Sequence, residues 1–265
     1  MLKVQSITKV FNHGTVNERV ALENVSLTLN TGDFVTVIGG NGAGKSTLLN
    51  SVAGVYPPDS GSIYVGDVNV SKLPEYKRAK YLGRVFQDPM MGTAADMNIE
   101  ENLALAYRRG KPRTLRWGIT SQEREQYYHL LKTLELGLED RMSSKVGLLS
   151  GGQRQALTLL MATLHKPQLL LLDEHSAALD PKTARKVLEL SDRFIKEDGL
   201  TTMMVTHNMR DAIKYGNRLI MMSAGEIAID VSGEEKQRLT VEDLLRMFER
   251  VRGDDEEIPD RMVLG

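Results

Sequence analysis

The chain has 265 residues, of which 41% are hydrophobic and 26% charged, and this composition excludes disorder across the whole chain. Its 34 lysines and arginines are balanced by 35 aspartates and glutamates, so no basic excess indicates a nucleic-acid-binding protein. The absence of cysteine excludes disulfides, thiolate catalysis and zinc sites that use cysteine ligands.

The first 30 residues predict a pair of strands joined by a hairpin loop. Apolar and polar residues alternate in Met1 to Val10 and again in Val20 to Leu29, with polar residues 12–18 between them. The beginning of the chain therefore predicts a strand and not a signal peptide, which has an uninterrupted apolar segment. No apolar run approaches the roughly 18 residues of a membrane-spanning helix, because the longest one is interrupted at residues 165–167.

Strand and helix patterns alternate along the rest of the chain. Apolar runs at Phe34 to Ile38, Ser62 to Val65 and Leu82 to Phe86 predict strands, and Ser46 to Gly54 predicts a helix. From residue 93 the apolar residues recur at helical spacing, which indicates an inserted helical lobe. Further strands are expected at 169–172, 202–205, 219–222 and 226–231, and further helices at 181–197, 209–215 and 240–252.

This order of elements predicts an α/β fold with a mostly parallel sheet. We expect an N-terminal antiparallel β subdomain and an α-helical subdomain inserted at about residues 93–155. Residues 1–252 should form a single domain, followed by an acidic and flexible tail at 253–265.

A phosphate-binding loop follows the strand at Phe34 to Ile38. Residues 39–47, Gly-Gly-Asn-Gly-Ala-Gly-Lys-Ser-Thr, match the pattern GxxxxGK[ST] in its required position between a strand and a helix. The glycines let backbone N–H groups converge on a phosphate, and the N-terminus of the helix adds its positive dipole. A glycine-rich loop could merely join a strand to a helix, but the Lys-Ser pair at this offset favours the core of a P-loop NTPase. The expected ATP-binding residues here are Gly39, Asn41, Gly42, Ala43, Gly44, Lys45, Ser46 and Thr47, with Lys45 on the β- and γ-phosphates and the Ser46 hydroxyl on Mg²⁺.

Two acidic residues, Asp173 and Glu174, end the four-leucine strand at 169–172. In P-loop ATPases the acid at this strand end orders Mg²⁺, so we expect Asp173 to take that role. Glu174 would then orient the attacking water as a general base. The alternative for such a pair is a helix N-cap, which the buried strand before it makes less favourable.

The segment Leu149-Ser150-Gly151-Gly152-Gln153 precedes an apolar helix. With this segment, the P-loop and the acidic strand end in this order, the chain resembles the ABC-type ATPases, the nucleotide-binding subunits of ABC transporters, over residues 1–230. The resemblance implies in-line attack of water on the γ-phosphate of ATP in a head-to-tail homodimer that forms on ATP binding. The residues Ser150, Gly151, Gly152 and Gln153 of one subunit would close over ATP held by the P-loop of the other.

The same resemblance assigns roles to four further residues. Phe11 would stack on adenine, although it could be an ordinary core residue at a strand end. Gln87 would contact Mg²⁺ or the attacking water, although it could be a solvated loop residue. Asp180 would connect the two ATP sites of the dimer, and it could also cap the helix that begins at Pro181. His207 would contact the γ-phosphate, although a lone histidine at a strand end is usually structural.

Four anchors, Gly39, Gln87, Asp173 and His207, each follow an apolar strand. Because ligands of open α/β sheets bind at the carboxyl ends of the strands, we expect these anchors to converge on one crevice. The expected catalytic residues are Lys45, Gln87, Glu174 and His207, the expected metal ligands are Ser46, Gln87 and Asp173, and the expected cofactors are ATP and Mg²⁺.

Three positions depart from the family's usual pattern. His175 stands where proline is usual, and Ala156 and Met161 stand where arginine is often found. Because a histidine beside the general base can titrate near neutral pH, His175 predicts pH-sensitive activity.

The resemblance implies a peripheral protein on the cytoplasmic face of a membrane, where it would power a separate integral permease. The permease would contact residues 87–97 and the helical subdomain, and an extracytoplasmic substrate-binding protein would act with it. The segment Gln87 to Ala94 resembles importers of amino acids or other small solutes. The alternatives are an exporter subunit or an ABC ATPase of DNA repair or translation. ATPases of the last class carry coiled-coil insertions or a second ATPase domain, and this sequence shows neither feature. We therefore expect no nucleic-acid partner.

Overall fold

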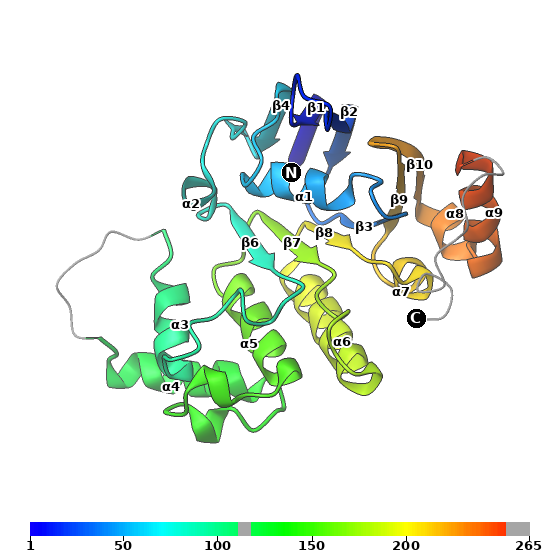
Figure 1. The fold of residues 1–265 in the computed structure, drawn as a ribbon. Coiled ribbons are helices and arrows are strands. Elements are labelled where there is room, and N and C mark those ends of the chain that lie inside the picture. Colours follow the sequence, from blue (N-terminus) through cyan, green and yellow to red (C-terminus); the bar gives the residue numbers. More distant parts are fainter. Residues whose placement is uncertain (111–117, 253–265) are drawn as a thin grey trace.

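A computed structural model describes residues 1–110 and 118–252, which form two sheets with helices between and around them (Figure 1). The smaller sheet is antiparallel, with the strand order β2-β1-β4-β5. Its strands are β1 (Leu2–Phe11), β2 (Arg19–Leu29), β4 (Ser60–Val65) and β5 (Val68–Asn69). The alternation of buried and exposed residues in β1 and β2 places one face of this sheet in the core, as the sequence predicted.

The larger sheet has six strands in the order β10-β9-β3-β8-β7-β6. Its strands are β3 (Phe34–Gly39), β6 (Leu82–Val85), β7 (Leu169–Asp173), β8 (Thr202–Val205), β9 (Arg218–Ser223) and β10 (Glu226–Ser232). All neighbouring pairs are parallel except β9 and β10. Every residue of β3 and β8 is buried, because helices cover both faces of the parallel part. The expected α/β fold class is confirmed.

Helix α1 (Lys45–Ala53) lies between the two sheets (Figure 1). Its Leu48, Leu49 and Val52 share one apolar core with both sheets. On the opposite face of the large sheet, α6 (Pro181–Asp198) packs beside α5 (Gly151–Thr163). The helix that carries the P-loop lysine is therefore clamped between two layers of strands.

The helical lobe consists of α3 (Ile99–Tyr107), α4 (Ser121–Lys132) and α5, with short 3₁₀ turns at Glu139–Arg141 and Val146–Leu148. A capping box begins each of the three helices, in which a side chain at the N-cap and another three residues later satisfy the free N–H groups. Because α5 also packs on β6 and α6, the lobe shares one apolar core with the large sheet.

The C-terminal part contains α7 (Met209–Lys214), α8 (Gly233–Arg238) and α9 (Val241–Arg252), and α9 buries Leu244 and Phe248 against β9 and α7. The sequence did not predict α8 or α2 (Glu75–Arg78), which contain six and four residues. Helix α2 contains about one turn, and α8 contains no apolar side chain, so neither produces an apolar periodicity. The acidic tail at 253–265 lies outside the described residues.

Candidate functional site

The strand order places four functional loops side by side. Along the sheet, β3 leads into the P-loop, β8 into His207, β7 into Asp173 and Glu174, and β6 into Gln87. Backbone hydrogen bonds connect these segments. The Thr206 N–H donates to the Val37 carbonyl at 3.1 Å, and the Glu174 N–H donates to the Val205 carbonyl at 3.0 Å. The carboxyl ends of these parallel strands thus meet at one edge, which is where the sequence places a ligand crevice.

Two glycines of the P-loop are required by space and by backbone conformation. Gly39 has a φ of 151°, and a Cβ there would lie 2.3 Å from the carbonyl oxygen of Met222. Gly44 has a φ of 101°, and a Cβ there would lie 2.7 Å from the carbonyl oxygen of Ala21. The loop can therefore pass between β9 and β2 only with glycine at these positions.

Lys45 folds back over the P-loop. Its Nζ donates hydrogen bonds to the carbonyls of Gly39 at 2.8 Å and Gly40 at 2.9 Å, and the side chain is buried. At the N-terminus of α1 no described side chain forms a cap, and Asn41, Gly42 and Ser46 are exposed. An uncapped helix N-terminus beside an ammonium group fits a phosphate.

The acidic pair has two different environments. Burial raises the pKa of Asp173, and the charge of Arg84 opposes that shift from 3.3 Å. Glu174 has a φ of 45°, a left-handed conformation that is uncommon for a residue other than glycine and that turns its side chain away from the strand direction. Neither residue caps a helix, because Asp180 caps the next one, α6. The alternative that the pair is an N-cap is therefore wrong.

His207 and Glu174 are in direct contact. The Nε2 of His207 lies 2.6 Å from the Oε1 of Glu174, and the glutamate side chain is only 9% exposed. The contact arises because β7 and β8 are parallel neighbours, with Asp173 opposite Val205. A histidine and a carboxylate that are 33 residues apart in sequence are thereby brought together next to the P-loop.

The segment at 149–153 forms the N-terminus of α5 on the helical lobe. The Ser150 hydroxyl accepts a hydrogen bond from the Gln153 N–H at 3.3 Å, and the Gln153 Oε1 accepts one from the Ser150 N–H at 3.2 Å. Gly152 is buried against α6, where a Cβ would lie 1.9 Å from the Cγ2 of Thr183, while Ser150 and Gly151 are exposed. Within the described residues, no hydrogen bond or ion pair joins this segment to the P-loop of the same chain.

The remaining candidates lie near the exposed edge of the site. Phe11 is half-buried at the end of β1, and its ring packs edge-on against Tyr56 with 5.2 Å between centroids, so it is not an ordinary core residue. Gln87 is exposed in the loop after β6. Asp180 accepts a hydrogen bond from the Thr183 N–H at 3.1 Å, which confirms its expected role as an N-cap. Hydrogen bonds from the side chain and then the backbone of Thr183 lower the pKa of Asp180.

His175 is not placed to sense neutral pH. It is buried, and its Nε2 lies 2.9 Å from the Oγ of Ser191, which itself donates to the Val187 carbonyl. Since the Ser191 proton is engaged, His175 is the donor in this contact. Burial lowers the pKa of His175 to about 4, so the ring is neutral over the usual range of activity measurements. The expectation of pH-sensitive activity through this residue is therefore wrong.

Arg84 is a charged residue of the site that the sequence reasoning missed. Its guanidinium contacts Asp173, and its NH2 donates to the Oδ1 of Asn50 in α1 at 2.7 Å. The available signal was a single arginine inside the apolar strand Leu82–Phe86. Alternation alone could not show that this side chain faces the acidic end of β7.

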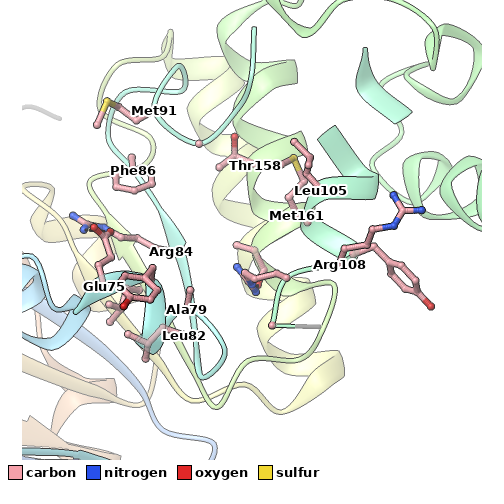
Figure 2. Close-up of a pocket in the computed structure, with 18 of the residues that line it drawn as sticks. Glu75, Ala79, Leu82, Arg84, Phe86, Met91, Leu105, Arg108, Thr158 and Met161 are labelled. Atoms are coloured by element: carbon pink, nitrogen blue, oxygen red, sulfur yellow. Dashed lines mark hydrogen bonds and ion pairs between the residues drawn. The ribbon is translucent and has the colours of Figure 1, made fainter. Parts of the chain in front are cut away.

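A cavity of about 1650 Å³ lies beside β6, between α2 and the helical lobe (Figure 2). Figure 2 shows Glu75, Arg84 and Phe86 on one side of this cavity and Leu105, Thr158 and Met161 on the other. We call this cavity the groove. Two of its apolar residues, Met91 and Leu105, are 66% and 56% exposed, which is unusual for large apolar side chains.

The described residues contain no cluster of three or more acidic, histidine or cysteine side chains that could hold a metal ion by themselves. The expected Mg²⁺ ligands do not require such a cluster, since Mg²⁺ at nucleotide sites is bound by one or two protein oxygens together with phosphates and water. None of the described helices is long and apolar enough to cross a bilayer.

Residues 22–177 match a family model described as ABC transporter. A tyrosine transport ATP-binding protein of Clostridioides difficile is 45% identical over 94% of this chain and 99% of that protein. An uncharacterized ABC transporter ATP-binding protein of Methanocaldococcus jannaschii is 34% identical over 90% of this chain and 98% of that protein. The fold is similar to a dimeric ATP-binding cassette solved with ADP and phosphate, with a TM-score of 0.74, 31% identity, and 88% of this chain and 98% of that chain covered.

Proposed function

The chain belongs to the ABC transporter family of ATP-hydrolysing, ATP-binding subunits, and from this premise we propose that it powers the uptake of an amino acid through a separate membrane permease. The observation that carries the amino-acid part is the 45% identity, over nearly the full length of both chains, to a tyrosine transport ATP-binding protein. An ATP-binding subunit does not itself bind the transported solute. The similarity therefore indicates the class of transport system to which the chain belongs, and it identifies no solute site in this chain.

We propose that the edge of the large sheet binds ATP and that residues 1–252 act as one ATPase unit. Lys45 and the N–H groups at the start of α1 would hold the phosphates, and Phe11 would stack on adenine at the end of β1. Mg²⁺, when bound, would neutralise phosphate charge. Ser46, Gln87 and Asp173 supply the hydroxyl, amide and carboxylate oxygens that suit this ion.

The contact between Glu174 and His207 supports a role in hydrolysis. Glu174 would orient or deprotonate the attacking water, and its position next to Asp173 and its left-handed backbone conformation support this role. His207 contacts this carboxylate at 2.6 Å and would hold its orientation, and one-third of the His207 side chain is exposed, which would leave it free to contact the γ-phosphate. Pre-oriented groups of this kind stabilise the charge that develops during phosphoryl transfer.

The exposed N-terminus of α5 supports an ATP-dependent, head-to-tail dimer. ABC cassettes form dimers, as in the solved cassette with ADP and phosphate. Ser150 and Gly151 are exposed on the lobe, and the start of the 13-residue helix α5 provides an anion site. In the proposed dimer Ser150, Gly151, Gly152 and Gln153 of one subunit would close over the γ-phosphate held by the other, with Asp180 near the shared interface.

The groove is the surface that we assign to the permease. Arg84 and Phe86, which directly precede the loop of Gln87 in sequence, line the groove on one side, and residues of the helical lobe line it on the other. Exposed apolar side chains such as Met91 and Leu105 suit a protein partner. Binding there would hold the subunit at the cytoplasmic face of the membrane, and a substrate-binding protein would act on the other side.

The test is transport by a reconstituted complex. The chain would be co-expressed with a candidate permease of an amino-acid transport system, purified as a complex, and placed in liposomes with an amino acid inside or outside. ATP-dependent uptake of tyrosine or a related amino acid is expected, and the Glu174→Gln complex should assemble without transport. A complex that hydrolyses ATP but moves no amino acid would refute the proposed solute class, and transport in the outward direction would refute the importer.

A further inference from the structure

Arg84 connects the groove to the acidic end of β7, and none of the functions proposed above uses it. Its NH2 lies 3.3 Å from the Oδ2 of Asp173 and 2.7 Å from the Oδ1 of Asn50. Its NH1 lies 3.7 Å from the Oε1 of Glu75, which stands on α2 at the wall of the groove. One guanidinium therefore contacts the P-loop helix, the acidic strand and Glu75 at the wall of the groove. Figure 2 shows Arg84 beside Glu75 at that wall.

The surroundings of Arg84 are those of a buried ion pair. The Arg84 side chain is 13% exposed and the Asp173 side chain 16% exposed, and the guanidinium carbon lies 4.4 Å from the centroid of the Phe86 ring. Among the described residues, the Arg84 Nε has no hydrogen-bond partner. Since charges attract strongly where water is excluded, the positive charge of Arg84 acts on Asp173 with little screening.

Glu75 competes with Asp173 for the same guanidinium. Its side chain is 55% exposed, and it faces the groove while Asp173 faces the nucleotide edge. A guanidinium can be shared between two carboxylates because its N–H donors point in several directions. The more strongly the guanidinium interacts with Glu75, the less it compensates the negative charge of Asp173.

We propose that Arg84 is a positioning residue that divides its charge between Glu75 and Asp173 and thereby sets how strongly Asp173 attracts a divalent cation at the nucleotide site. The inference rests on the proposed role of Asp173 as a metal ligand. A divalent cation and a guanidinium compete for one carboxylate, so Arg84 weakens cation binding and Glu75 relieves that effect. A partner that touches Glu75 from the groove would change the cation affinity without touching the nucleotide.

Mn²⁺ binding to the full chain tests this proposal. The protein would be saturated with a non-hydrolysable ATP analogue, and free Mn²⁺ would be followed by electron paramagnetic resonance. Arg84→Met should bind Mn²⁺ about tenfold more tightly, the effect of removing a positive charge near a carboxylate. Glu75→Gln should bind it about twofold more weakly, the size expected for a half-exposed pair. Because Arg84 carries both effects, the double variant should match Arg84→Met.

Opposite signs distinguish this role from a structural one, since a residue that merely supports the fold would weaken binding in both variants. Arg84→Lys, which keeps the charge, should stay near the wild type, and Glu234→Gln, at another exposed glutamate, should change nothing. Equal or weaker Mn²⁺ binding in Arg84→Met overturns the proposal. If that variant does not fold, Glu75→Gln decides alone, and unchanged binding there overturns it as well.

Asp173→Asn separates this inference from the proposed function. If Asp173→Asn loses most of its Mn²⁺ binding and Arg84→Met gains none, the metal ligand stands and the role of Arg84 falls. If Asp173→Asn binds Mn²⁺ like the wild type, the assignment of Asp173 as a ligand is wrong, and the role of Arg84 falls with it.

Discussion

The sheet edge and the helical lobe carry the two halves of the proposed ATP site, and they differ in how complete they are. At the sheet edge, Lys45, Glu174 and His207 are already in contact with partners of the same chain. On the lobe, Ser150 and Gly151 face solvent, and the Ser150 hydroxyl is engaged in the capping box of its own helix. In the proposed site, the phosphate and water half would therefore be assembled by one chain, whereas the second anion site would need another molecule.

This difference has a cause in the fold. Parallel strands bring their ends together whatever binds there, so the sheet edge is built during folding. A helix N-terminus on a separate lobe is satisfied locally by its capping box and gains nothing from the P-loop of the same chain. We therefore expect substitutions at the sheet edge to impair ATP binding or hydrolysis directly, and substitutions at Ser150 to weaken the dimer while ATP binding to the monomer stays unchanged.

The largest effect is expected for Glu174→Gln. The amide cannot accept the proton of the attacking water, so ATP hydrolysis should fall by about a thousandfold, within the usual range for loss of a general base. ATP binding should remain, because Lys45 and the P-loop are unchanged, and the ATP-bound dimer should persist. Phosphate release and light scattering with ATP measure the two effects. A variant that hydrolyses ATP at the normal rate would show that another group activates the water.

Lys45→Ala tests the sheet edge through binding rather than turnover. The lysine contributes a charged hydrogen-bond donor to the phosphates, and it also closes the loop onto Gly39 and Gly40. Its loss should weaken ATP binding by about tenfold to a hundredfold, as for a hydrogen bond to a charged group. Titration with a fluorescent ATP analogue measures the affinity. Thermal melting of the same protein checks that the fold survives, and tight binding by a folded variant would contradict the assigned cradle.

Much of this sheet edge was predictable from the sequence, for a physical reason. Each anchor follows a short apolar run, and such runs become parallel strands whose ends must meet, so Gly39, Asp173 and His207 could be placed without coordinates. The contact between Glu174 and His207 needed the strand order, because nothing in the sequence shows that β8 lies beside β7.

Roles that depend on contacts with neighbouring elements were not predictable from the sequence. Arg84 stands in an apolar strand and His175 beside the proposed base, and their neighbours decide their roles. Ser191, the partner of His175, is 16 residues away on α6, so the sequence did not show that the two residues are in contact. It also did not show that His175 is buried, which is why the expected pH sensitivity was wrong. The groove was also not predictable from the sequence, because its walls come from segments spread between residues 53 and 171.

Acid should destabilise the fold through His175 rather than change turnover near neutral pH. The ordinary pKa of histidine, near 6.5, applies to the unfolded chain, and burial lowers it to about 4 in the folded protein. The unfolded state therefore takes up a proton first, and stability falls as the pH drops from about 6.5 toward 4, by about 2 kcal/mol or more over that range.

Urea denaturation at pH 7 and pH 5 measures this slope for the wild type and His175→Gln. The variant should lose less stability between the two pH values, even if its stability at pH 7 is lower because the contact with Ser191 changes. His129→Gln, at an exposed histidine of α4, is the matched control and should keep the wild-type slope. Equal slopes in wild type and His175→Gln would show that this ring is not the buried group that acid protonates.

Ser150→Ala separates the two halves most directly, although its effect on stability is the smallest. Loss of the cap should cost about 1 kcal/mol, and loss of the hydroxyl should weaken the ATP-dependent dimer of the Glu174→Gln background about tenfold. ATP binding to the monomer should not change, because the P-loop lies elsewhere. Thr120→Ala removes the equivalent cap of α4 in the same lobe and should lose the same stability without weakening the dimer. If both variants weaken the dimer equally, the lobe contributes only its fold, and the second anion site is not at Ser150.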